Sequence, residues 1–239
     1  MIHLSKRLQA VADMVTPGSR PVDVGCDHAY VPIYLVENHI ADRVTAMDVH
    51  LGPVRRAEKN VEAAGLSRDQ VAVRYSYGLD MCFPGEADCL IIAGMGGRLI
   101  CEIFDREYKR KREILGGFKE MVLSPHSDAD LVRRKLHSLE YRIDRENMVI
   151  DAGKYYTIIH AVKGQERYGR EEEYLYGKCL IDQRHPILKA YADKTLAAKN
   201  ELRQKLKEIS TPKALEYAPK LQEEIDSLEY VLSQFQTGE

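Results

Sequence analysis

The strongest constraint on the fold is the order of apolar segments in the first 165 residues. Short runs rich in β-branched residues alternate with segments of helical periodicity. This alternation favours a mainly parallel sheet, because parallel strands need a long crossover that a helix usually supplies. The predicted strands are 22–24, 44–49, 71–76, 89–94 and 120–125, the predicted helices are 4–14, 29–39, 53–64, 97–104 and 128–139, and two antiparallel strands within 141–163 close the sheet.

The last third of the chain has a different character. Beyond about residue 165 the sequence is highly charged, and apolar residues step by three and four from Leu188 to Ile209 and again from Ala214 to Phe235. Ser210-Thr211-Pro212 separates the two series, and proline is well tolerated at the first position of a helix. We therefore expect a coiled-coil-like helical hairpin, in which Pro219 marks either the start of the second helix or a bend within it. The expected domains are 1–165 and 166–239.

Composition excludes several classes of protein. The formal net charge is −2, which leaves nucleic-acid binding to be judged from local charge. The five cysteines show no CxxC spacing, so we expect neither a disulfide framework nor a metal site. No apolar run could span a bilayer, and the N-terminal segment lacks the apolar core of a signal peptide. We expect a cytoplasmic protein; the sequence is compatible with a monomer but leaves the oligomeric state open.

The stretch VDVGCDHAYVP, residues 22–32, places an acidic turn after the first strand. A dinucleotide-binding turn would have three glycines here, whereas this one has only Gly25, so an oxidoreductase is disfavoured. Asp23 and Asp27 flank that glycine and would suit a ligand with positive charge, such as an ammonium or a sulfonium. The plain alternative is a strand-to-helix turn in which Asp27 caps the helix.

Three further stretches follow strand ends in order. Asp48 ends the second strand, about twenty residues after Gly25, where a carboxylate can bind both hydroxyls of a ribose. In YGLD, residues 77–80, Leu79 could cover an adenine face and Asp80 could accept from its amine. IIAGMGG, residues 91–97, lets the main chain approach a ligand at the carboxyl edge of the sheet. Together the four stretches predict S-adenosylmethionine bound by a Rossmann-like methyltransferase.

The motifs LSKRL (4–8), VDVGCDHAYVP, YGLD and IIAGMGG together resemble the TrmK family of bacterial tRNA methyltransferases, which modify N1 of adenine 22. The resemblance implies that Gly25, Asp27 and His28 line the methionine moiety, and that Asp48 lies at the ribose. It implies further cofactor contacts from Arg7, Val49, Asn60, Gly78, Leu79, Asp80, Ala93, Gly94 and Met95, with Arg7 at the methionine carboxylate. The chain departs from the family at Ser124-Pro125-His126, where the family resembles Gln-Pro-Asn.

The expected reaction needs no strong base, because the N1 lone pair lies in the plane of the adenine ring. The methylated product is cationic, so Asp27 is the first candidate for a catalytic acidic group; it could equally hold the ammonium of the cofactor. His28 could orient Asp27 or the substrate. The alternatives are a methyltransferase acting on another RNA or a small molecule, and a non-catalytic RNA-binding protein that keeps this fold.

Local positive charge supplies candidate contacts to tRNA phosphates. Basic residues cluster after the fourth strand, and the segment 184–209 carries seven basic residues against three acidic ones. Each cluster could equally be an ordinary solvated surface. The candidate RNA-binding residues are Arg106, Lys109, Arg110, Lys111, Lys199 and Arg203.

Overall fold

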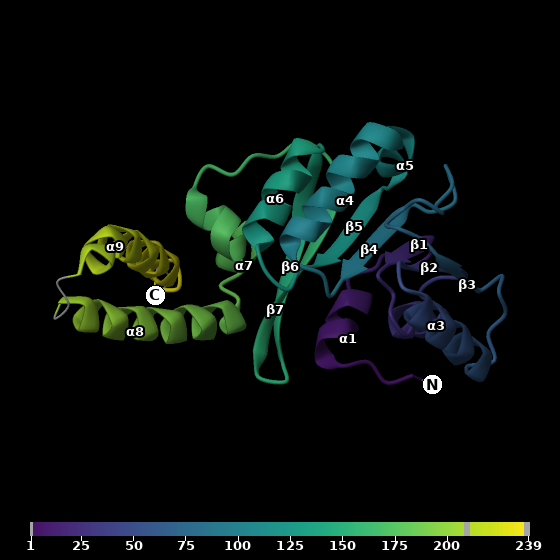
Figure 1. Ribbon diagram of the computed structural model, residues 1–239, viewed down its shortest axis with the longest axis horizontal. Coiled ribbons are helices and arrows are strands. Elements are labelled where there is room, and N and C mark those ends of the chain that lie inside the picture. The colour runs from purple at the N-terminus through teal and green to yellow at the C-terminus, as the bar shows by residue number, and fades with distance from the viewer. Residues whose placement is uncertain (1, 208–210, 237–239) are drawn as a thin grey trace. The chain divides into compact units, whose positions relative to one another are not determined.

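Figure 1 shows the computed structural model of the chain, which describes residues 2–207 and 211–236. The contacts within the chain divide it into two compact units, Met1–Arg167 and Tyr168–Glu239. The first unit contains the whole sheet, and the second is helical. Ile209 and Ser210, which belong to the series predicted for the hairpin, lie outside the described residues.

The first unit is built on one sheet of seven strands, in the order β3-β2-β1-β4-β5-β7-β6. The first five strands run parallel, and β7 is antiparallel to both β5 and β6. This confirms the predicted Rossmann-like class. The strands are β1 (Pro21–Val24), β2 (Val44–Asp48), β3 (Val71–Tyr75), β4 (Cys89–Ala93), β5 (Glu120–Ser124), β6 (Tyr141–Asp151) and β7 (Lys154–Lys163).

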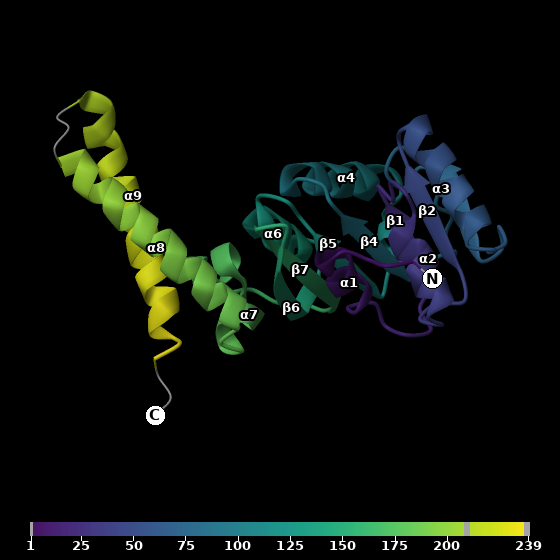
Figure 2. The same cartoon turned by 90° about the horizontal axis from the view of Figure 1, so that it is seen from below.

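Helices cover both faces of the sheet. Figures 1 and 2 show α1, α2 and α3 on one face and α4 and α6 on the other. Because β1 leads outward to β2 and β3 while β4 leads to β5, the chain changes direction between β1 and β4. The carboxyl ends of these two strands therefore form the switch point at which α/β sheets bind ligands. The helices are α1 (Lys6–Ala12), α2 (Tyr30–Glu37), α3 (Leu51–Ala63), α4 (Gly97–Arg110), α5 (Arg112–Gly117) and α6 (Ala129–Ser138).

The core of the first unit follows the predicted pattern. Val11 of α1, Ile33 of α2 and Ile91 of β4 belong to one buried apolar cluster and have no exposed surface. Ile100 and Phe104 are completely buried on α4. At 20–33 cal/mol for each Å² of apolar surface, this burial is the main stabilising contribution.

The largest differences from the predicted helices of the first unit follow β4. The sequence predicts that the helix from Gly97 ends at residue 104, but α4 continues to Arg110, and α5 follows without having been predicted. Residues 105–110 are almost all polar, so periodicity gives no signal there. The structure shows why the helix continues, since Glu107 faces inward and is completely buried.

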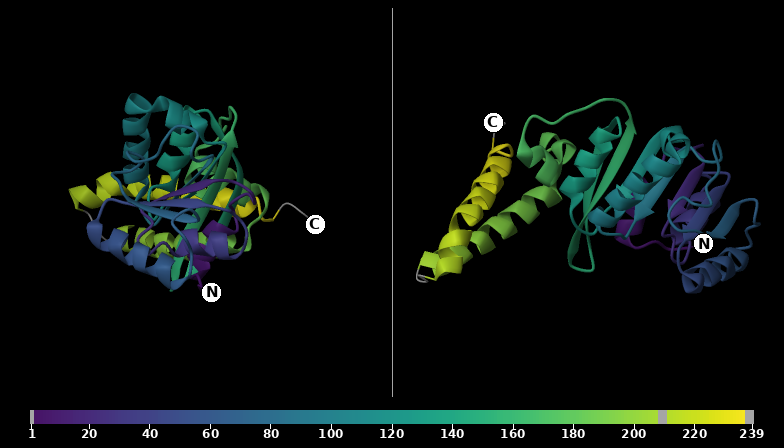
Figure 3. Two further views of the ribbon diagram at one scale, coloured as in Figure 1. Left: turned by 90° about the vertical axis from the view of Figure 1, so that its right-hand side faces the viewer. Right: turned by 45° about the horizontal axis from the view of Figure 1, so that its top comes forward.

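The second unit contains a π-helical turn η1 (Glu173–Gly177), a short helix α7 (Lys178–Asp182), and two long helices, α8 (Pro186–Lys207) and α9 (Pro212–Ser233). Helices α8 and α9 lie side by side and run in opposite directions (Figures 2 and 3), as predicted for a hairpin. Leu188, Ala192, Leu221 and Ile225 are buried. The second helix begins at Pro212 and continues through Pro219, so it does not start at the later proline.

In the part of the chain that the structure describes, no helix combines the length and apolarity needed to cross a bilayer.

A buried ion pair joins α6 to β6 and should make a measurable difference to stability. Arg133 Nε lies 2.8 Å from Glu146 Oε1, and both side chains are at most 1% exposed. Replacing only Arg133 by Met leaves a buried carboxylate without this cation, and we expect a loss of about 3–5 kcal/mol. The double variant Arg133→Met/Glu146→Leu should lose less than Arg133→Met alone. Urea unfolding followed by circular dichroism measures both variants; a double variant at least as destabilised as Arg133→Met would contradict this expectation.

Candidate functional site

The turn after β1 has an unusual backbone. Gly25, Asp27 and Ala29 all have positive φ, at 81°, 47° and 58°. Such values are uncommon for residues with a side chain and gather at functional sites. Helix α2 begins only at Tyr30, and its N-cap, Ala29, makes no side-chain hydrogen bond. Asp27 is therefore not the helix cap, which removes the plain alternative for this residue.

Asp48 holds this turn in place. The carboxylate is buried at the end of β2, and Oδ2 accepts a hydrogen bond of 3.2 Å from the backbone N–H of Asp27. Oδ1 accepts another of 2.9 Å from His50 N–H. Each carboxylate oxygen has two lone pairs, so Asp48 keeps acceptor capacity for ribose hydroxyls. Val49, which follows directly, is half-buried.

Asp23, the first acidic residue of the motif, lies beside this turn, although it is not among the cofactor contacts that the TrmK resemblance implies. Its side chain is buried on β1, next to β2. Burial, with the neighbouring charge of Asp48 as a smaller cause, raises the pKa of Asp23 to about 7. The sequence contained a signal, because Asp23 directly precedes Val24 and Gly25 in the acidic motif.

The side chains of Asp27 and His28 lie at the accessible side of the turn. The Asp27 carboxylate is 64% exposed, 3.5 Å from His28 Nε2 and 3.6 Å from Arg56 Nη2. The His28 ring stacks on Tyr30 with a centroid distance of 5.2 Å. Arg56 and Tyr30 were not predicted as site residues. Asn60 supports the turn from α3 by donating a hydrogen bond of 2.9 Å to the His28 carbonyl.

The turn after β4 meets the turn after β1. A Cβ atom added to Gly25 would lie 2.3 Å from Met95 Cε, so a larger residue would displace the Met95 side chain, and the φ of 81° would also strain that residue. Gly94 has a φ of 89°, and its N–H donates to the Ser124 carbonyl at 3.2 Å. The Met95 carbonyl accepts from His126 N–H at 2.8 Å. These two hydrogen bonds join the predicted 93–95 turn to the 124–126 loop, where the chain departs from the TrmK pattern. Ala93, the first residue of the turn, is half-buried.

Arg7 approaches the same turn from α1. Its Nη1 atom lies 3.6 Å from the position of a Cβ on Gly94, and the guanidinium lies 5.3 Å from the centre of the Tyr156 ring. Within the described residues Nη1 is buried and makes no hydrogen bond. A buried donor without a partner is costly, so this nitrogen is suited to an anionic ligand.

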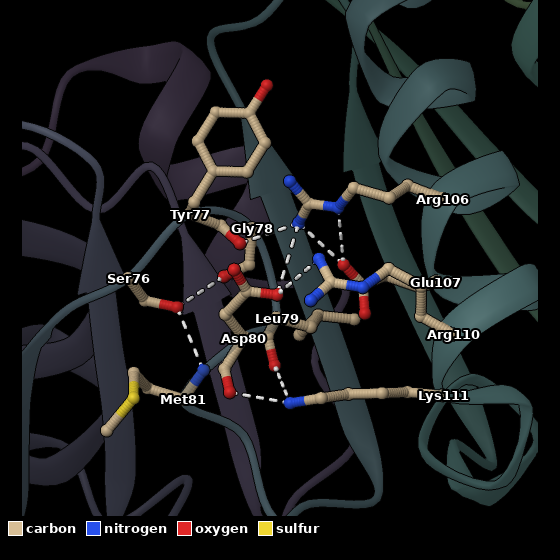
Figure 4. Close-up of polar contacts among 10 residues, drawn as sticks. All are labelled: Ser76, Tyr77, Gly78, Leu79, Asp80, Met81, Arg106, Glu107, Arg110 and Lys111. Atoms are coloured by element: carbon tan, nitrogen blue, oxygen red, sulfur yellow. Dashed lines mark hydrogen bonds and ion pairs between the residues drawn. The ribbon is translucent and has the colours of Figure 1, made fainter.

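The loop after β3 contributes Gly78, Leu79 and Asp80 (Figure 4). Leu79 is completely buried and presents no accessible surface, so its predicted contact with adenine stays a prediction. The Asp80 carboxylate is 33% exposed and pairs with Arg110 at 3.3 Å. The exposed side chains of the loop are Tyr77, at 59%, and Met81, at 42%.

The predicted RNA-binding residues lie in both units. In the first unit Lys109 is exposed on α4, whereas Arg106, Arg110 and Lys111 contact the 76–81 loop. In the second unit Lys199 pairs with Glu224 at 2.6 Å, and Arg203 donates to Gln222 at 3.0 Å. The sequence could not indicate these partners, because each lies 19 or more residues away.

Several sequences and structures resemble this chain. Residues 4–159 match a family model described as a methyltransferase domain. The chain is 37% identical over 163 residues to the tRNA (adenine(22)-N(1))-methyltransferase of Bacillus subtilis (strain 168), a match that spans 68% of this chain and 66% of that relative.

Two solved structures resemble nearly the whole chain. The B. subtilis M1A22 tRNA methyltransferase TrmK is 28% identical with a TM-score of 0.85, over 97% of this chain and all of that one. A Streptococcus pneumoniae protein in complex with S-adenosyl-L-methionine is 32% identical with a TM-score of 0.81, over 96% of this chain and 100% of that one.

Fold and site together define a Rossmann-like methyltransferase, with the acidic turn at the switch point of the sheet. Within that class the chain belongs to the TrmK family.

The raised pKa of Asp23 gives a pH prediction. An unfolded Asp titrates near its usual value of 3.8, and the folded one near 7. The folded state therefore holds the extra proton between these values, and this contribution to stability is lost as the pH rises from about 4 to about 7. The full loss is at most about 4 kcal/mol.

Asp23→Asn cannot ionise, so its stability relative to the wild type should rise between pH 5 and pH 8. Urea unfolding at both pH values measures this difference. The exposed Asp42→Asn is a matched control and should follow the wild type at both pH values. Parallel pH profiles for the wild type and Asp23→Asn would show that Asp23 does not titrate in this range.

Proposed function

We propose that this protein transfers a methyl group from S-adenosylmethionine to N1 of adenine 22 in tRNA. One observation carries the proposal: the acidic residues Asp23, Asp27 and Asp48 surround the turn after β1, and a buried Arg7 nitrogen faces the adjoining turn after β4. Acidic groups beside one unpaired cationic donor complement a ligand that carries an ammonium, a sulfonium and a carboxylate. S-adenosylmethionine has these three groups.

The residues of the chain fit the cofactor along the edge of the sheet. The carboxylates of Asp23 and Asp27 would attract the positive end of its methionine moiety, and Arg7 would hold the carboxylate. Asp48 retains lone pairs for the ribose, and the 78–80 loop follows the neighbouring strand β3, where the adenine would bind. Gly25 and Gly94 leave the space that the main chain needs for a close approach. The cofactor, when bound, supplies the methyl group.

The protein has to align the target base and accommodate a positive charge. Adenine N1 has an in-plane lone pair, so no residue must remove a proton before the transfer. Alignment of two reactants can supply roughly 7–11 kcal/mol of the barrier reduction. The exposed Asp27 carboxylate would stabilise the charge that develops on the adenine ring, and the stacked His28 and Tyr30 rings beside it offer a flat surface to a base.

The tRNA would supply binding energy away from the reacting base, because N1 is hidden in a paired helix and turning a base out costs a few kcal/mol. Helix α8 carries six basic residues against two acidic ones, and Lys109 is exposed on α4. The pairs within α8, Lys189 with Asp193 and Lys205 with Glu201, are exposed and worth at most about 1 kcal/mol, so phosphates can displace them. Lys199 is less exposed and pairs with Glu224 of α9. Lys109, Lys199 and Arg203 are our candidate phosphate contacts, and a tRNA substrate would place the activity in the cytoplasm.

Nucleoside analysis by mass spectrometry tests the proposal directly. Unmodified tRNA with adenine at position 22, incubated with the full chain and methyl-labelled S-adenosylmethionine, should yield labelled 1-methyladenosine. The same tRNA with guanine at position 22 should remain unlabelled. Label on another nucleoside would indicate a different target, and no label together with no binding of the cofactor in calorimetry would favour the non-catalytic alternative.

Asp27→Asn should separate catalysis from RNA binding. We expect kcat to fall about 100-fold, because the carboxylate lies at the accessible side of the turn where the base would approach. The affinity for tRNA should change by less than about threefold, since most of that affinity comes from phosphate contacts. Single-turnover rates and fluorescence anisotropy measure the two quantities. An equal loss of both would remove Asp27 from the catalytic role.

A further inference from the structure

The end of α4 turns three cations toward the loop that follows β3. Figure 4 shows Arg106, Arg110 and Lys111 directed at Ser76–Met81, about thirty residues earlier in the sequence. We name these three side chains and the six loop residues the loop clamp. The same cations were predicted from the sequence to bind RNA phosphates.

Arg106 is fixed from both sides. Its Nη2 donates to the Tyr77 carbonyl at 2.6 Å, and the guanidinium lies 4.1 Å from the centre of the Tyr77 ring. Nε and Nη2 also contact Glu107 Oε1 at 2.9 Å and 2.5 Å. Glu107 is completely buried, and a buried carboxylate strongly requires its cation. Arg106 is therefore held by the protein rather than left free for a phosphate.

The carbonyls of four successive loop residues all have donors. Arg106 donates to Tyr77, and Ser76 Oγ donates to Gly78 at 2.9 Å while accepting from the Met81 N–H at 3.1 Å. Lys111 Nζ donates to the carbonyls of residues 79 and 80, at 3.4 Å and 2.5 Å. These hydrogen bonds restrict the backbone conformation of the loop, because buried backbone groups need partners and these partners lie on α4, at residue 111 and at Ser76.

Gly78 lies where the loop meets the helix. Its φ is 58°, which residues with a side chain rarely adopt, and a Cβ atom at this position would lie 2.5 Å from Arg106 Nη2. A larger residue at position 78 would therefore strain the backbone and displace the guanidinium from its contacts with the loop.

We propose that Arg106 and Lys111 are positioning residues for the adenosine part of the cofactor site, which they keep in its binding conformation through the loop clamp. This inference rests on the proposed function, in which the 78–80 loop receives the adenine. It removes both residues from the set that contacts RNA. The predicted RNA-binding residues that then remain on α4 are Lys109, which is exposed, and Arg110, which pairs with Asp80 at 3.3 Å.

The test compares cofactor and tRNA affinity in four full-length variants. Arg106→Lys keeps the charge but loses the forked contact with Glu107 and the stacking on the Tyr77 ring. Lys111→Met removes the hydrogen bonds to the carbonyls of residues 79 and 80. Gly78→Ala disturbs the loop without changing any charge. We expect each to weaken binding of S-adenosylmethionine about 10- to 100-fold in calorimetry, as is typical for supporting residues of a site. Their affinity for tRNA should stay within about threefold of the wild type.

Lys109→Gln is the matched control with the opposite expectation. It should bind the cofactor like the wild type, while the slope of log K for tRNA against log salt falls by about 1. If Arg106 contacted a phosphate instead, Arg106→Lys would keep its affinity for tRNA and would bind the cofactor like the wild type. That result would overturn the inference. Loss of tRNA affinity by Lys111→Met without loss of cofactor affinity would overturn it equally.

Two further readouts keep folding defects and the proposed function separate from this inference. A poorly folded variant has fewer active molecules, which lowers kcat without raising KM for the cofactor, whereas the clamp predicts a raised KM for the cofactor and an unchanged KM for tRNA. Hydrogen exchange at the Met81 amide should also become faster in Arg106→Lys. If the wild type itself fails to bind S-adenosylmethionine, the proposed function fails; if it binds and Arg106→Lys binds as tightly, only the inference fails.

Discussion

The site depends on the parallel pairing of β1 with β2 on one side and β4 on the other. The chain leaves β1 toward one edge of the sheet and leaves β4 toward the other, so no crossover covers the space between their carboxyl ends. The turns after these strands can therefore approach one another, as Gly25 and Met95 do. The other residues of the site lie on loops and helices around the space between the carboxyl ends of these two strands.

Electrostatics at the opening favour a positively charged ligand. Parallel strands bury Asp23 against β2 next to Asp48, and both burial and that neighbour oppose its ionisation. A cation would reverse this effect, because it stabilises the ionised form. The backbone of Asp27 and Ala29 has positive φ, and the Asp27 N–H in this turn donates to Asp48 at 3.2 Å.

The basic residues show that burial determines whether a cation is held by the protein or is available to a ligand. Lys189 and Lys205 form exposed pairs with acidic residues four positions away, and such pairs are weak. Arg106, in contrast, pairs with a completely buried carboxylate and contacts the backbone of a distant loop. The residues look alike in the sequence. Their different environments make α8 a candidate for exchangeable contacts with phosphate and make the end of α4 a structural support.

The sequence by itself determined the order of the seven strands and of the main helices, the helical hairpin, and the four turns at the strand ends, but not α5, η1 or α7. These features are local: hydrophobic periodicity, glycines, and acidic residues at strand ends can be read along the chain. It could not determine the continuation of α4 through polar residues, the buried position of Leu79, or the contacts of Arg106 with the 76–81 loop and of Lys199 and Arg203 with α9. These features depend on contacts between residues far apart in the chain, and only the folded structure brings those residues together.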